Sequence, residues 1–138
     1  MRFSAAEPIR AAGIDEGRLA ATLTRVDPSR VPVWRAAAWF RVLWPKGITA
    51  MAMPWGIYLA PEALARTPET LGPLMVHELT HIEQWRRLGP LGWARSYLGD
   101  YCRGRRQGLP HFEAYRAIGL EVEARDVARA LAPGGGGA

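Results

Sequence analysis

The segment MVHELTHIEQW, residues 75–85, places two of the chain's three histidines four residues apart, with a glutamate directly after the first. Apolar residues flank this trio on nearly every side of a helix: Met75, Val76, Leu79, Ile82 and Trp85. A helix that is apolar almost all round is buried, so we expect this segment to cross the core. Because buried imidazole and carboxylate groups need polar partners, the rest of the fold has to supply them.

The spacing of the trio is typical of a metal site. On an α-helix, His77 and His81 lie one turn apart on the same side and can direct two nitrogens at one ion. Glu78 then lies beside that ion, where a general base for an activated water is needed. The alternative is a pair of surface histidines, which the apolar flanks argue against. We therefore predict one zinc ion per chain, held in part by the His-Glu-x-x-His motif.

A catalytic zinc site needs a third protein ligand. The pattern His-Glu-x-x-His-x-x-Gly-x-x-His is excluded, because Gln84 and Arg87 stand at its last two defined positions. The later segment 114–131 offers Glu121 and Glu123, which lie roughly 75° and 85° to either side of the centre of its apolar stripe. Helical geometry alone does not choose between these two glutamates.

The pattern along the chain predicts strands first and helices afterwards, which is an α+β order. Apolar residues alternate over 34–44, which favours a strand, although periodicity does not exclude a helix there. Residues 48–53 and 56–60 are expected to form two strands joined by a turn. We predict helices over 73–88, 91–106 and from about 111 to 131, the last divided near Gly119.

Length predicts one domain over residues 1–132, followed by a flexible glycine-rich tail at 133–138. Residues 1–30 are expected to be a peripheral segment or a lid over the site. The longest uncharged run, residues 47–61, is too short to span a bilayer. We therefore expect a cytoplasmic protein that does not bind membranes, and the sequence does not indicate an oligomeric state.

The charge balance is 18 Lys+Arg against 13 Asp+Glu, a formal net charge of +5. Nucleic-acid binding through the arginines is one interpretation. The arginines are scattered along the chain, and no helix-turn-helix, zinc-finger or aromatic-platform signature accompanies them. We therefore expect no nucleic-acid partner.

The motif HELTHIEQW, followed some forty residues later by EAYRAIGLEVEA, resembles the small zincin-like metallopeptidase domains of the gluzincin type. These include short bacterial domains of unknown function. The resemblance covers about residues 48–131 and implies a minimal zincin-like fold, a small antiparallel sheet followed by three main helices. It also implies that Glu121 is the third zinc ligand, because Ala124 matches the alanine of a Glu-x-x-Ala-Asp motif. Arg125 replaces the aspartate of that motif, which normally supports a ligand histidine, and Asp126 is a candidate for that role.

The function implied by this resemblance is zinc-dependent hydrolysis of a peptide or protein substrate. Glu78 is expected to act as general base, with His111 or Tyr115 stabilising the oxyanion. A substrate would lie along an edge strand, 48–53 or 56–60. The alternative is a zincin-like module without activity that serves in binding or regulation. Arg125 and the small size favour that alternative, whereas the intact Glu78 opposes it.

Overall fold

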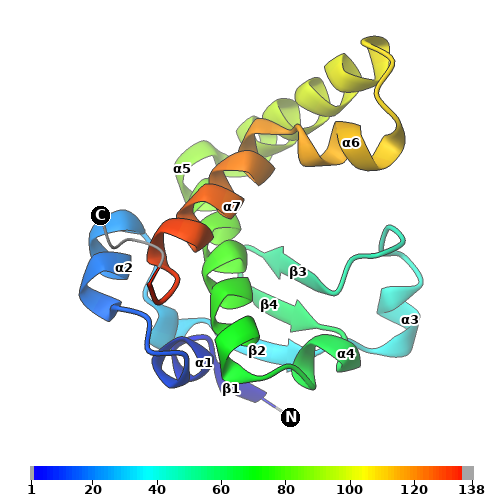
Figure 1. Ribbon diagram of the computed structural model, residues 1–138. Helices are drawn as coiled ribbons and strands as arrows, with labels where there is room; N and C mark the ends of the chain where they lie inside the picture. Colours follow the sequence, from blue (N-terminus) through cyan, green and yellow to red (C-terminus); the bar gives the residue numbers. More distant parts are fainter. Residues whose placement is uncertain (1, 135–138) are drawn as a thin grey trace.

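The computed structural model describes residues 2–134, in which four short strands form one sheet and helices pack against it (Figure 1). In chain order the elements are β1 (Arg2–Ser4), α1 (Ala6–Ala11), α2 (Glu16–Thr22), a 3-10 turn (Pro28–Arg30), β2 (Pro32–Arg35), α3 (Ala38–Arg41), β3 (Ala50–Met53), β4 (Gly56–Leu59), α4 (Pro61–Leu64), α5 (Pro68–Arg106), α6 (His111–Arg116) and α7 (Gly119–Leu131). The predicted α+β class is confirmed.

The sheet has the order β1-β2-β4-β3, which leaves β3 at one edge. As predicted, β3 and β4 form an antiparallel hairpin, with Met51 opposite Tyr58. The prediction of an antiparallel sheet was wrong, because β2 and β4 run parallel, with Val33 opposite Ile57. The crossover from β2 to β4 contains α3 and β3, a connection that local sequence patterns do not reveal.

The predicted strand over 34–44 was also wrong for most of its length. β2 ends at Arg35, and α3 follows after the extended residue Ala37. The alternation of apolar residues did not mark a buried face here, since Trp39 is 73% exposed and Val42 is 82% exposed.

Helix α5 supplies the centre of the fold. It starts at Pro68, five residues before the predicted start, because Pro68 takes the first-turn position that Pro73 was expected to fill. The predicted break is present: Gly89 has φ 72° and ψ 167°, and the helix changes direction there (Figure 1). The part before Gly89 is buried among α1, α7 and β3, and α6 returns beside the part after it.

Residues 2–30 contribute several side chains to the core, where the sequence suggested a peripheral segment or lid. Ile9, Leu19 and Leu23 pack in the main apolar cluster together with Leu79 of α5. β1 pairs with β2, which ties the start of the described chain to the sheet. Residues 135–138 of the predicted tail lie outside the described residues. Across residues 2–134, the structure contains no helix with both the length and the hydropathy that a bilayer span requires.

Candidate metal centre

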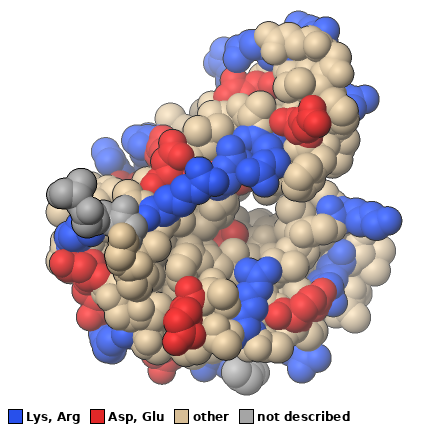
Figure 2. Space-filling view, viewed as in Figure 1, with Lys and Arg blue, Asp and Glu red and all other residues tan. Residues whose placement is uncertain are grey.

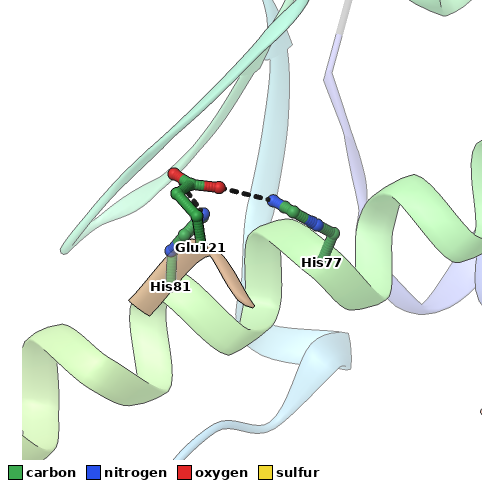
Figure 3. Close-up of side chains that lie close together, drawn as sticks. All are labelled: His77, His81 and Glu121. Carbon is green, nitrogen blue, oxygen red and sulfur yellow. Dashed lines mark hydrogen bonds and ion pairs between the residues drawn. The ribbon is translucent and has the colours of Figure 1, made fainter. Parts of the chain in front are cut away.

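Three side chains from two helices meet between α5 and α7. His77 and His81 project from one side of α5, and Glu121 reaches them from the first turn of α7 (Figure 3). The Glu121 carboxylate lies 3.2 Å from His77 Nε2 through one oxygen and 3.2 Å from His81 Nε2 through the other. One candidate ligand atom from each residue falls within 4.8 Å of the other two. This arrangement can hold a metal ion.

The charges of these groups are strongly coupled in the metal-free protein. Burial alone would raise the pKa of Glu121, but the hydrogen bonds and charges of His77 and His81 lower it well below its usual value. Burial likewise opposes protonation of His81, yet Glu121 and Glu78 together raise its pKa to about 9. The Glu121 carboxylate therefore stays ionised, and His81 remains doubly protonated and positively charged at neutral pH.

Glu78 differs from Glu121 in its surroundings. Burial raises the pKa of its carboxyl, an effect that His81 and His77 only partly offset. The residue is 6% exposed, and it borders both of the cavities that adjoin the candidate centre. A carboxyl with a raised pKa that faces an accessible space is suited to accept and release a proton.

Gln84 is a functional residue that the sequence reasoning missed. Its amide oxygen accepts a hydrogen bond from His81 Nδ1 at 2.9 Å, and its amide nitrogen donates to the carbonyl oxygen of Leu120 at 2.9 Å. The carbonyl can only accept, which fixes the orientation of the amide. His81 Nδ1 therefore carries a hydrogen, and a neutral imidazole has its lone pair on Nε2, toward Glu121. Once His81 gives up its second proton, the contact with Gln84 thus leaves the free lone pair on Nε2, the atom that faces Glu121 and His77.

The two candidate glutamates of α7 have different partners. Glu121 is 4% exposed and contacts both histidines, whereas Glu123 forms an ion pair with Arg87 at 3.2 Å. Asp126, the candidate support for a ligand histidine, is exposed on α7. The contact from Gln84 to His81 occupies that supporting position instead.

Two cavities adjoin the centre, and Glu78 and Tyr115 border both. One, which we name the aromatic cavity, has a volume of about 280 Å³. Its wall includes Trp85, Trp93 and Tyr97, and residues of β3 also line it. The other, which we name the arginine cavity, has a volume of about 400 Å³. Its lining includes Arg66, Arg125 and Arg129, together with His77 and Glu78.

The aromatic wall is a stack of three rings. Trp85 and Trp93 have ring centroids 4.2 Å apart, and those of Trp93 and Tyr97 are 4.6 Å apart, with nearly parallel planes in both pairs. Tyr97 Oη donates a hydrogen bond to Glu121 Oε1 at 3.3 Å. Burial and the Glu121 charge raise the pKa of Tyr97, which keeps the phenol protonated. The stack therefore ends on the candidate ligand glutamate.

The two candidate oxyanion donors are placed differently. Tyr115 borders both cavities, and burial together with the Glu121 charge raises the pKa of its phenol, so it remains a hydrogen-bond donor. His111 is exposed at the start of α6, where its Nδ1 lies 2.7 Å from Tyr101 Oη. It does not border either cavity.

Comparison of the chain with protein-family models, with curated proteins and with solved structures finds no match. The chemistry of the site is therefore inferred from the geometry of its residues.

The donor set suits zinc. Two nitrogens and one carboxylate oxygen are common zinc ligands, and two ligands of one tetrahedral ion lie roughly 3.3 Å apart. The separations from Glu121 to the two imidazoles, both 3.2 Å, fit that value. In the metal-free protein, the Glu121 carboxylate and the two imidazoles satisfy one another through a hydrogen bond and ion pairing. The residues present are thus compatible with a zinc ion.

Proposed function

We propose that this chain is a zinc-dependent hydrolase of peptide bonds, a small zincin-like metallopeptidase of the gluzincin type. The observation that carries the proposal is the convergence of His77, His81 and Glu121, with Glu78 beside them and facing two cavities. A catalytic zinc site needs three protein ligands and access for water and substrate. A general base is of no use to a purely structural metal site, so the position of Glu78 favours catalysis.

In this proposal His77, His81 and Glu121 hold the zinc ion. When bound, zinc supplies Lewis-acid chemistry: it acidifies water and polarises a carbonyl. Glu78 accepts the proton of the attacking water on its carboxylate and passes it to the nitrogen of the leaving amine. Tyr115 donates its phenolic hydrogen toward the developing negative charge on the carbonyl oxygen. Gln84 keeps His81 Nδ1 protonated and thereby keeps the imidazole oriented.

The edge strand β3 is the proposed track for the substrate backbone. It pairs with β4 on one side only, and its residues line both cavities. A peptide that adds to this edge would pass directly beside Glu78. The proposed location of the scissile bond is therefore between the aromatic and the arginine cavities.

The alternative is a module without activity that binds a partner or a metal. Arg125 favours it, because a cation stands where a supporting aspartate is expected. The two functions differ in their need for a base at position 78, so one substitution separates them.

The deciding experiment compares Glu78→Gln with the matched control Glu123→Gln. Metal analysis of the purified wild-type protein should give about one zinc per chain, and both variants should retain it. Against a mixed peptide library, Glu78→Gln should reduce hydrolysis by about 100-fold or more, as expected for loss of a general base. Glu123→Gln should leave the rate close to that of the wild type. Equal hydrolysis by the wild type and by Glu78→Gln would refute the proposed enzyme.

A further inference from the structure

The arginine cavity concentrates positive charge beside the candidate metal centre. Arg66 lies between α4 and α5, and Arg125 and Arg129 lie on α7. Figure 2 shows basic side chains on both sides of a hollow in this face of the molecule. Among the described residues that line this cavity, Glu78 is the only acidic one. The charge of the cavity wall is therefore strongly positive.

These three arginines have no carboxylate partner among the described residues, in contrast to several arginines elsewhere. Arginines that do form ion pairs are Arg10, Arg25, Arg41, Arg87 and Arg103. In the cavity, Arg125 donates to the carbonyl oxygen of Arg116 at 2.8 Å, and Arg66 donates to Thr49 Oγ1 at 3.4 Å. Both bonds go to neutral oxygens. The guanidinium charges are thus available to an anion from outside the chain.

A guanidinium group binds a carboxylate through two parallel hydrogen bonds. The cavity adjoins His77 and Glu78, so an anion bound there would belong to a residue near the bond being cleaved. Arg125, which stands where a supporting aspartate is expected, lines this cavity, whereas Gln84 makes a supporting contact to His81.

We propose that the arginine cavity binds a carboxylate of the substrate, which makes acidic peptides the preferred substrate class. The inference rests on the proposed function. The carboxylate is either an aspartate or glutamate side chain or the free C-terminus of the peptide. Both sources present the same group to the guanidinium ions, and the experiment below separates them.

A nucleic acid is a different anionic partner and suits this cavity less well. Its charges repeat at every phosphate, and proteins bind it with basic surfaces that follow several phosphates in succession. Here the three arginines line one open hollow of about 400 Å³, with the carboxyl of Glu78 in the same wall. A hollow of this volume offers room for one or two carboxylates.

The test measures binding rather than hydrolysis. The protein is the Glu78→Gln variant with zinc added, and calorimetric titration gives the dissociation constant. The first pair of probes is a capped peptide rich in Asp and Glu and the same peptide with Asn and Gln in their place. The second pair is a neutral peptide with a free C-terminus and its amidated form. A single-stranded oligonucleotide serves as competitor. In this background, Arg66→Ala and Arg129→Ala are compared with Arg106→Ala, an exposed residue at the end of α5 that removes the same charge.

We expect the acidic peptide, or the peptide with a free C-terminus, to bind more tightly than its uncharged counterpart. Arg66→Ala and Arg129→Ala should each weaken that binding by about 3- to 5-fold, the upper range for an exposed ion pair. Arg106→Ala should leave it unchanged. Equal binding of charged and uncharged peptides would overturn the proposal. So would an equal loss in Arg106→Ala, or displacement of the peptide by the oligonucleotide at lower concentration.

The result of the binding titrations can be distinguished from the result of a hydrolysis assay on the wild-type protein. Repeating the titrations without zinc reports on the arginine cavity even if the chain holds no metal. Acidic preference without any peptide cleavage would reject the enzyme and keep the binding site. Peptide cleavage without a preference for acidic peptides would keep the enzyme and reject the binding site.

Discussion

The contact between Gln84 and His81 gives the sharpest prediction for the candidate centre. Gln84 is fully buried and makes two hydrogen bonds, one to His81 Nδ1 and one to the carbonyl oxygen of Leu120, both at 2.9 Å. Gln84→Leu keeps a similar volume and removes both. His81 Nδ1–H then has no partner in the core, which costs about 1–3 kcal/mol. The Leu120 carbonyl keeps its intrahelical partner, so losing the second bond costs about 1 kcal/mol more.

We therefore expect Gln84→Leu to lower the free energy of unfolding of the metal-free protein by about 2–4 kcal/mol. Loss of a group that orients a ligand histidine weakens metal affinity by about 10- to 100-fold. Urea unfolding measures the stability, and competition with a chromogenic chelator measures the zinc affinity. Because misfolding alone would also reduce zinc binding, the affinity is compared at urea concentrations where each variant is folded.

Two further variants separate orientation from stability. Gln84→Glu keeps an acceptor for His81 Nδ1 but loses the donor to Leu120, so it should destabilise the fold while zinc affinity stays within a few-fold of the wild type. Thr80→Val is the control, since Thr80 is fully buried and bonds only to the carbonyl oxygen of Val76, at 2.8 Å. Wild-type zinc affinity in Gln84→Leu, or an equal loss in Thr80→Val, would refute the role given to Gln84.

Further predictions concern the candidate metal ligands and the packing of α5. Glu121→Gln should abolish zinc binding while Glu123→Gln retains it, and elemental analysis of dialysed protein decides between them. Because His81 has a pKa of about 9 without metal, zinc binding near neutral pH should release about one proton and strengthen about tenfold per pH unit, which calorimetry in buffers of different ionisation heat detects. The raised pKa also means that His81 stabilises the metal-free protein below about pH 6.5, and this contribution should be lost as pH rises toward 9. A Cβ at Gly72 would lie 2.3 Å from a side chain of the N-terminal segment, so Gly72→Ala should cost about 1–3 kcal/mol in thermal unfolding. Gly99→Ala, which meets nothing within 4 Å in the same helix, should stabilise by about 0.5–1 kcal/mol.

The sequence predicted the parts of the site that local geometry determines. The four-residue spacing of His77 and His81 brings both rings to one side of α5, and their centroids are 4.9 Å apart. Helical periodicity could not decide whether Glu121 or Glu123 is the third ligand, because both flank the apolar stripe of α7. What separates them is the rotation of α7 about its axis, which depends on contacts such as Gln84 with Leu120. Those contacts join residues 36 positions apart, and no local pattern encodes them.

Several parts that the sequence did not predict depend on long-range packing. β1 is three residues long and is recognisable only through its pairing with β2. Tyr97 reaches Glu121 across 24 positions, and Arg66, in the loop before α5, lines the same cavity as Arg129 of α7. The charge of a cavity wall is a property of several elements together. The scattered positions of the arginines in the sequence therefore did not indicate that three of them line one cavity.

One backbone position, Gly89, joins the two parts of α5 that together form the aromatic wall of the cavity. In a straight helix, Trp85 and Trp93 would be separated by about 12 Å along the axis, eight residues at 1.5 Å each. Their ring centroids are 4.2 Å apart, so the break at Gly89 is needed to bring them together. Its φ of 72° lies in a region that glycine adopts without strain. The same break directs Tyr97 to Glu121, and the conformation of Gly89 therefore shapes both the wall of the cavity and the support of a candidate zinc ligand.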